Sequence, residues 1–205
     1  MKSLIGSEEL LNRHTGSFEP VELYDEIDAG HLDQFEKLWW PAIQARFKQF
    51  PSLEKAGEGN VQDAGWRWNE LVPATPRLDL CTFSVECSGT LQGMMRVFTT
   101  RRSRLAGELD LVYIDRLASA PWNRRRFTEN PKYKGVGELL MAAAVSLSVD
   151  RECKGRLALH SLPESESYYA NIGMQDLGPD LKSEHLRYYE MTEQTATSFL
   201  SGRAL

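Results

Sequence analysis

The sequence predicts a mixed β-sheet with helices on both faces, within the α/β (α+β) class. Three observations predict it. Apolar and polar residues alternate in several short runs, a helical spacing replaces the alternation elsewhere, and the two kinds of run are interleaved. Their order is strand, helices, three strands, helix, strand, helix, strand, which is typical of a sheet covered by helices.

The first part of the chain is predicted to hold one strand and two helical stretches. Residues 18–27 alternate as a half-buried strand does. Residues 31–50 carry apolar positions at helical spacing, which Pro41 should break or kink, and residues 61–72 indicate a shorter helix. The paired tryptophans of the first stretch, Trp39 and Trp40, fit the core better than a substrate wall. Residues 1–16 are assigned to a flexible N-terminal extension.

A hairpin begins at Leu78, where the period changes to two. Its strands are residues 78–87 and 90–100, with Gly89 in the turn, and residues 108–119 add a third strand. Residues 136–152 place apolar side chains at i, i+3, i+4 and i+7, which predicts an amphipathic helix able to lie close on a sheet. Further elements are a strand at 155–162, a short helix at 164–174 closed by Gly173, and a last strand at 185–191.

Length and composition favour a single domain over residues 1–205, because 205 residues with 41% hydrophobic and 26% charged side chains suit one soluble core. The net charge of −5 weighs against a dedicated nucleic-acid binder. The start lacks the apolar segment of a signal peptide, and no run approaches a membrane span, so we expect a cytoplasmic protein. Three cysteines without a C-x-x-C pair indicate neither a disulfide framework nor a metal site.

The stretch NPKYKGVGELL, from Asn130 to Leu140, places two glycines at the start of a predicted helix. Unpaired backbone N–H groups and the helix dipole favour a phosphate there, although an ordinary tight turn gives the same pattern. A P-loop would need a lysine directly after its last glycine, and a Rossmann fingerprint would need a third glycine where Leu140 stands, so neither motif is present.

Three motifs carry a resemblance to the GNAT N-acetyltransferase family. Residues 132–137 (KYKGVG) resemble the family's [R/Q]-x-x-G-x-[G/A] signature, with a lysine at its first position. Residues 117–121 (LASAP) are similar to the end of its fourth strand, and residues 167–174 (SYYANIGM) resemble the pattern of its fourth helix. The resemblance covers roughly residues 78–191 and implies the GNAT acyl-CoA N-acyltransferase fold. Leu162 departs from it, standing where many members have asparagine.

The resemblance implies acetyl-CoA as cosubstrate. Backbone amides of the turn would hold its pyrophosphate, and the backbone at the end of the strand would hold pantetheine and polarise the thioester. The residues so implied are Leu117, Ser119, Lys132, Tyr133, Lys134, Gly135, Val136 and Gly137. The expected function is acetyl transfer to a primary amine of a small molecule or protein by direct attack in a ternary complex. The alternative is a non-catalytic acyl-CoA-binding sensor.

Two catalytic residues are expected. Tyr169 matches the family's tyrosine that gives a proton to the departing CoA sulfur; otherwise it and Tyr168 form a half-buried aromatic pair. Asp115 would face the cleft from its strand and accept the amine's proton or hold the ammonium, with an ion pair to a nearby arginine as the equal alternative. His160 is a second candidate base, although a lone strand histidine is more often structural.

The arginines 124–126 fit either a surface loop or contact with an anionic group of cofactor or acceptor. The expected partners are a small-molecule or protein amine, with no membrane and no nucleic acid. A homodimer is common in the family. The acceptor itself is not encoded in any motif, since one fold serves many amines.

Overall fold

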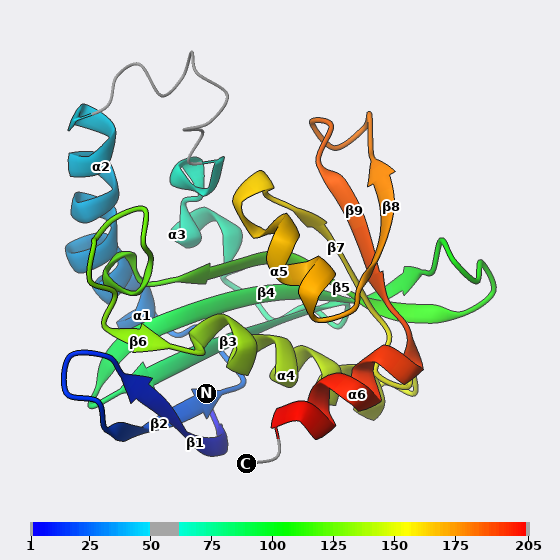
Figure 1. Cartoon of the computed structure of the whole chain (residues 1–205), viewed down its shortest axis with the longest axis horizontal. Coiled ribbons are helices and arrows are strands. Elements are labelled where there is room, and N and C mark those ends of the chain that lie inside the picture. The colour runs from blue at the N-terminus through cyan, green and yellow to red at the C-terminus, as the bar shows by residue number, and fades with distance from the viewer. Residues whose placement is uncertain (1, 50–61, 204–205) are drawn as a thin grey trace. The chain divides into compact units, whose positions relative to one another are not determined.

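The computed structural model describes residues 2–49 and 62–203 (Figure 1). The strands are β1 (Leu4–Asn12), β2 (Phe18–Tyr24), β3 (Leu80–Cys87), β4 (Thr90–Arg102), β5 (Asp110–Ser119), β6 (Tyr133–Lys134), β7 (Leu157–Ser161), β8 (Gln175–Pro179) and β9 (Arg187–Met191). The helices are α1 (Ala29–Gln34), α2 (Trp40–Gln49), α3 (Trp68–Leu71), α4 (Val136–Asp150), α5 (Glu166–Asn171) and α6 (Glu193–Arg203). Short 3-10 or π turns are η1 (Phe35–Trp39), η3 (Gln62–Gly65), η4 (Pro121–Asn123) and η5 (Pro163–Ser165).

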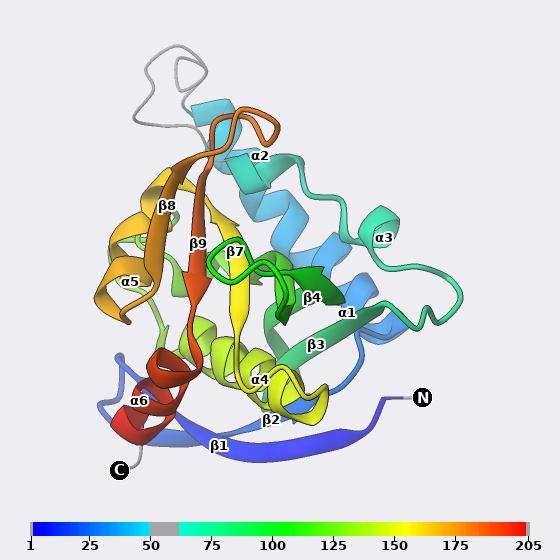
Figure 2. The same ribbon diagram turned by 90° about the vertical axis from the view of Figure 1, so that its right-hand side faces the viewer.

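The described strands form one sheet in the order β6-β1-β2-β3-β4-β5-β7-β9-β8. β5 and β7 run parallel, whereas β1 with β2, and β9 with both β7 and β8, run antiparallel. Figure 2 shows β7, β9 and β8 side by side. The mixed sheet predicted from the sequence is therefore confirmed.

The chain divides into two compact units, each assembled from separate segments. Unit 1 comprises residues 1–76, 82–95 and 117–140, and unit 2 comprises residues 77–81, 96–116 and 141–205. β4, β5 and α4 each contribute residues to both units. The expectation of a single domain stays a prediction.

Helices cover both faces of β4 within unit 1. Met94 belongs to a core cluster with Phe35, Trp39 and Trp68, which come from the α1–η1–α2 segment and from α3. A Cβ on the adjacent Gly93 would stand 2.6 Å from Val136 Cγ1, in the first turn of α4. Successive strand residues point to opposite faces, so α4 lies against one face of β4 and the α1–η1–α2 segment against the other.

The break expected at Pro41 occurs just before the proline. The π turn η1 ends at Trp39, and the Trp40 N–H reaches back to the Phe35 carbonyl. Pro41 has no N–H to continue the α-helical pattern, and a π turn is a common accommodation of such a defect. Trp39 is 1% exposed, as expected of a core residue, and Trp40 packs half-buried beside it. Phe50 and Val61, which end and begin the two predicted helices, lie outside the described residues.

Within the described residues, three strands and one helix lie outside the predicted elements. β1 lies within residues 1–16, so the assignment of this segment to a flexible extension is corrected: residues 4–12 pair with β2 along almost their whole length. β6, β8 and α6 were also not predicted. The helix at 136–152 is present as α4, but every residue from Leu139 to Val145 is buried, so its middle is enclosed on all sides rather than amphipathic.

The second unit has its own packing. Leu111, Ala158 and Tyr188 form a buried cluster with Tyr113 against it. Gly155, with φ of +80°, lies where a Cβ would be 2.7 Å from Ala196 Cβ, so its backbone passes directly under α6. No helix among residues 2–49 and 62–203 is long and apolar enough to cross a bilayer.

Substituting Gly93 tests the close approach of α4 to β4. Gly93→Ala would place its Cβ 2.6 Å from Val136 Cγ1 and 3.0 Å from Leu140 Cδ1, so we expect a loss of about 1–3 kcal/mol in the free energy of unfolding. Gly107→Ala is the control, because nothing lies within 4 Å of its Cβ position. Urea denaturation measures both, and equal stabilities of the two variants would contradict the close packing.

Candidate functional site

The glycine turn predicted to hold phosphate is anchored on the N-terminal strand. β6 pairs antiparallel with the end of β1, with Tyr133 opposite Asn12 and Lys134 opposite Leu11. Gly135 follows with φ of +101°, a conformation that favours glycine, and its carbonyl accepts the first α-helical hydrogen bond, from Leu139 N–H at 2.9 Å. α4 therefore begins at Val136 in a fixed position.

Two backbone donors at this helix start are unused. Among residues 2–49 and 62–203, no group accepts a hydrogen bond from the N–H of Val136 or Gly137. The positive end of the dipole of α4, a helix of 15 residues, lies at the same place. The pair suits an anionic group such as a phosphate.

Lys132 and Tyr133 differ from the rest of the predicted turn, because their amides are already bonded. Lys132 N–H donates to the Trp122 carbonyl at 2.9 Å, and Tyr133 N–H donates to Asn123 Oδ1 at 3.0 Å. These two amides are thus not free for a cofactor, and only the side chains of the two residues could meet a ligand. By contrast, the N–H groups of Val136 and Gly137 make no such bond within the described residues.

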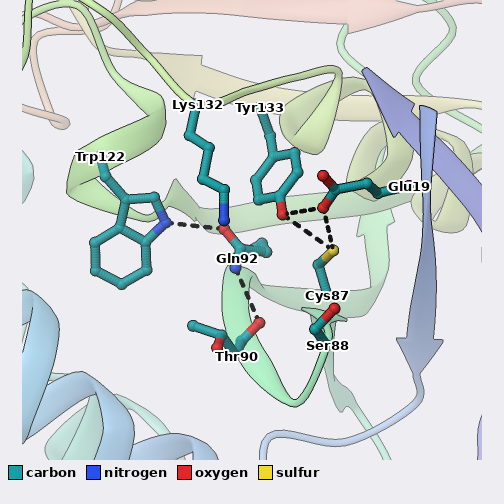
Figure 3. A pocket seen from close by; sticks show the side chains of 8 residues that line it. All are labelled: Glu19, Cys87, Ser88, Thr90, Gln92, Trp122, Lys132 and Tyr133. Carbon is teal, nitrogen blue, oxygen red and sulfur yellow. Dashed lines mark hydrogen bonds between the residues drawn. The ribbon is translucent and has the colours of Figure 1, made fainter. Parts of the chain in front are cut away.

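The side chains of Lys132 and Tyr133 line a cavity of about 340 Å³ (Figure 3). Tyr133 is 4% exposed, and its hydroxyl donates to Glu19 Oε2 at 2.6 Å and accepts from Cys87 Sγ at 3.3 Å. Burial first, and then these bonds, raise the pKa of Tyr133. The hydrogen bond from Tyr133 lowers the pKa of Glu19, and a second one from Asn12 adds to the effect. The other residues of the wall are Ser88, Thr90, Gln92 and Trp122.

No sequence pattern indicates this cavity, because its walls come from four separate segments of the chain. Trp122 Nε1 and Asn123 Nδ2 both donate to Gln92 Oε1, at 2.9 and 3.0 Å. Lys132 Nζ lies 4.7 Å from the centre of the Tyr133 ring. A local sequence motif does not predict contacts between residues that are so far apart in the sequence.

Gly137 brings the helix start against the predicted pantetheine strand. A Cβ on Gly137 would lie 3.9 Å from Leu117 Cδ2, near the end of β5. Pairing of β5 with β7 covers Val112 to Ile114 only, and β5 runs on to Ser119 beyond it. Leu117 and Ser119 thus lie in the part of β5 that is not paired with β7. Backbone N–H groups that bind a cofactor would have to lie in such an unpaired part of the strand.

Tyr169, the predicted proton donor, lies on α5 in unit 2. It is 9% exposed, and its ring contacts those of Tyr168 and Tyr189 at centroid distances of 5.3 and 5.9 Å. Within the described residues its hydroxyl has no hydrogen-bond partner. Burial raises the pKa of Tyr169, so the phenol holds its proton at neutral pH.

Asp115 is engaged in ion pairs. Its carboxylate lies 3.4 Å from Arg96 Nε and 3.1 Å from Arg116 Nη1. An ion pair with a nearby arginine is the alternative that the sequence offers to a catalytic role of Asp115. The role of Asp115 as a base stays a prediction. His160, the second candidate, is hydrogen-bonded to Tyr113 and to Asp180.

The arginine cluster at 124–126 does not act as one group. Arg124 donates through both Nη1 and Nη2 to the Asp63 carboxylate, which is 7% exposed, and its guanidinium stacks on Phe127. This arginine is therefore structural. Arg125 is exposed.

Within the described segments, neither a cluster of metal-ligating side chains nor a disulfide is present. No three His, Cys, Asp or Glu side chains of residues 2–49 and 62–203 converge as ligands. Cys81, Cys87 and Cys153 form no disulfide with one another, and the last two are buried.

The positive φ of Gly135 makes it the sensitive glycine of the turn. We expect Gly135→Ala to lower the free energy of unfolding by about 1–2 kcal/mol, because an L side chain is strained there and its Cβ would meet Leu10 Cδ2 at 3.2 Å. Gly137→Ala should leave stability unchanged or higher, since its Cβ position is open and alanine favours helix. Urea denaturation measures the free energy of unfolding of both variants. A larger loss for Gly137→Ala than for Gly135→Ala would contradict this geometry of the turn.

Comparison with known proteins places the fold. No model of a known protein family matches the chain, and no curated protein sequence matches it. Among solved structures, FeeM, an N-acyl amino acid synthase from uncultured soil microbes, is 10% identical with a TM-score of 0.53, over 87% of this chain and 93% of FeeM. The putative arylalkylamine N-acetyltransferase 7 of the yellow fever mosquito Aedes aegypti is 11% identical with a TM-score of 0.53, over 93% and 95%. The chain has the GNAT acyl-CoA N-acyltransferase fold.

Proposed function

We propose that this protein is an N-acyltransferase that transfers an acetyl group from acetyl-CoA to a primary amine. The observation that carries the proposal is the pair of unused N–H groups of Val136 and Gly137 at the start of α4, next to Leu117 at the end of β5. Both similar structures bear names that describe N-acylation, which is consistent with the proposal.

The amides of Val136 and Gly137 would hold the pyrophosphate of the cosubstrate. A diphosphate has several acceptor oxygens and negative charge, which the donors and the helix dipole both favour. Lys134 is exposed beside them and adds a cation. The backbone of Leu117 and Ser119 is the expected partner of pantetheine and of the thioester oxygen, where a fixed donor stabilises the charge that develops during attack.

The reaction requires a neutral amine and a protonated leaving group. As the amine nitrogen bonds to the thioester carbon and the carbon–sulfur bond breaks, the departing thiolate needs a proton. Tyr169 supplies it in this proposal, since its buried phenol is protonated at neutral pH. Asp115 would hold the substrate ammonium or take its proton if the acceptor displaces Arg96 or Arg116 from the carboxylate.

A non-catalytic acyl-CoA sensor is the second candidate, and the ion pairs of Asp115 favour it. The Asp115 carboxylate is already engaged by Arg96 and Arg116, and an acceptor amine would have to compete with both. The sensor would bind CoA through the same turn and transfer nothing. The acceptor amine, a cytoplasmic location and a homodimer remain predictions of the sequence.

Cofactor binding is the first test. We expect CoA and acetyl-CoA to raise the melting temperature and ATP to leave it unchanged, since a ligand at about 100 times its Kd adds roughly 2.7 kcal/mol to stability. Val136→Pro sharpens the test, because proline suits the first helical position yet removes the amide donor. It should weaken CoA binding by about 10-fold or more, as expected for a lost hydrogen bond to a charged group.

Val136→Ala is the matched control, because it keeps the amide while truncating the same buried side chain. Calorimetric titration with CoA compares the two variants. Equal affinities would mean that the Val136 amide does not hold the pyrophosphate, and no heat from the unsubstituted protein at millimolar CoA would remove the proposed function.

Catalysis by Tyr169 is the second test. With acetyl-CoA as donor and tryptamine, spermidine, methionine and a lysine-containing peptide as acceptors, thiol release should depend on the acceptor. Tyr169→Phe should lower kcat by about 100-fold with CoA affinity unchanged, because the ring contacts remain and only the proton donor is lost. Tyr168→Phe, the adjacent tyrosine of α5, should stay near the original rate. CoA binding without any acceptor-dependent thiol release from the original protein would favour the sensor.

A further inference from the structure

Unit 2 contains a chain of three hydrogen-bonded side chains that the proposed function does not use. Tyr113 Oη lies 2.6 Å from His160 Nδ1, and His160 Nε2 lies 3.1 Å from Asp180 Oδ2. Tyr113 is on β5, His160 is on β7, and Asp180 directly follows β8. The phenol can donate to the imidazole only if Nδ1 is unprotonated, so the consistent arrangement has the His160 proton on Nε2, facing the carboxylate.

Charged and titratable groups from several elements surround His160. Asp180 is held by Arg104, and the Arg104 guanidinium also lies 3.7 Å from the centre of the Tyr188 ring. Tyr188 in turn packs on His160, with ring centroids 4.9 Å apart. The groups that face Tyr113, His160 and Tyr188 are Arg104, Asp115, Arg116, Asp180 and Glu190.

The protonation states suit a relay. Burial raises the pKa of Tyr113 to about 12, so the phenol is protonated and available as the donor to His160. The hydrogen bond from Arg104 lowers the pKa of Asp180, and bonds from the Lys182 backbone and from His160 add to this effect. Asp180 is therefore ionised at neutral pH and stabilises positive charge on the imidazole, as carboxylates do in catalytic histidine pairs.

The position of the cluster along the strands also points to chemistry. The parallel pairing of β5 and β7 has Tyr113 opposite Ala158 and ends with Ile114 opposite Leu159. His160 is the first residue of β7 beyond that pairing, and Tyr113 is one residue before its end on β5. The phenol and imidazole thus meet where the two strands stop pairing, and both side chains are only partly buried.

We propose that Tyr113, His160 and Asp180 form a proton relay in which the Tyr113 oxygen takes the proton of the acceptor ammonium while His160 Nδ1 takes the proton of Tyr113. This inference rests on the proposed acyl transfer and names its base. It assigns Tyr113 as the catalytic residue that touches the substrate, and His160 and Asp180 as residues that act through it.

The proton balance of this step closes. The ammonium loses one proton to Tyr113, Tyr113 passes its own to His160, and the resulting imidazolium releases a proton to solvent after turnover. The free amine then forms the carbon–nitrogen bond as the carbon–sulfur bond breaks, and its second proton leaves as the thiolate is protonated. The products are the amide, the thiol and one proton, with no further reactant.

Two variants test the relay, and one serves as a control. Tyr113→Phe keeps the ring beside His160 and removes the hydroxyl. Asp180→Asn keeps the oxygen that accepts from Lys182 N–H and removes the charge. Asp79→Asn is the control, because Asp79 is also a carboxylate bound by an arginine, Arg77, but touches none of the relay residues. For each, kcat/KM is measured from pH 5 to 9 with acetyl-CoA and the best acceptor of the four amines, beside CoA affinity and melting temperature.

The relay predicts a distinct result for each protein. In the original protein kcat/KM falls as pH decreases, because the imidazolium cannot accept a proton. Tyr113→Phe lowers kcat/KM by about 100-fold and removes this acid limb. Asp180→Asn lowers the plateau of kcat/KM, because the carboxylate no longer stabilises the imidazolium that forms during turnover. CoA affinity is unchanged in both, and Asp79→Asn matches the original protein.

The contrary outcomes are distinguishable. If the original protein transfers acetyl groups and Tyr113→Phe keeps its rate and acid limb, the relay is wrong and the proposed function stands. If Tyr113→Phe and Asp180→Asn lose activity only in step with melting temperature, the cluster is structural and the relay is again wrong. If the original protein binds no CoA, the proposed function fails and the relay falls with it.

Discussion

The absence of a side chain at Gly93 is the constraint on which the candidate site depends. Val136 and Leu140 occupy the space that a Cβ would take, so the first turn of α4 lies directly on β4. That contact fixes where the helix begins, and Gly137 then lies against Leu117 at the end of β5. Close packing transmits such positions because protein interiors leave little room for adjustment. A larger residue at one position of one strand would thus shift the N–H groups that face a ligand.

The backbone N–H groups of the glycine turn fall into two kinds. Some are hydrogen-bonded within the protein, and others have no acceptor among the described residues. The amides of Lys132 and Tyr133 bond to Trp122 and Asn123, and the Tyr133 side chain is tied to Glu19. Those bonds immobilise the segment that precedes the helix. Within residues 2–49 and 62–203, the N–H groups of Val136 and Gly137, further along the same turn, have no acceptor. Rigid support next to unsatisfied donors is what an anion site requires, since little order must be gained on binding.

The sequence predicted those features that repeat locally. Period-two alternation identified β3, β4 and β5, and helical spacing identified α4, because both patterns are set by neighbours within one element. β6 has only two residues and carries no period, and β1 is defined by its pairing rather than by alternation. The pairing of Asp115 with Arg96 and the contacts of His160 join residues from different strands. Tyr113 and His160 are 47 residues apart, so no spacing rule connects them. The turn could be predicted because its glycines are only one residue apart, whereas its partners lie far away in the sequence.

The bond between Tyr133 and Glu19 also bears on the order in which the protein is made. The two residues are 114 positions apart, and the same region pairs β6 with β1. A chain grows from its N-terminus, so the β1–β2 hairpin leaves the ribosome long before its partner strand exists. Until residue 134 has been synthesised, one end of β1 presents unpaired backbone groups to other chains. Exposed strand edges can pair with other chains, and the formation of β6 covers Leu11 and Asn12 at this end of β1.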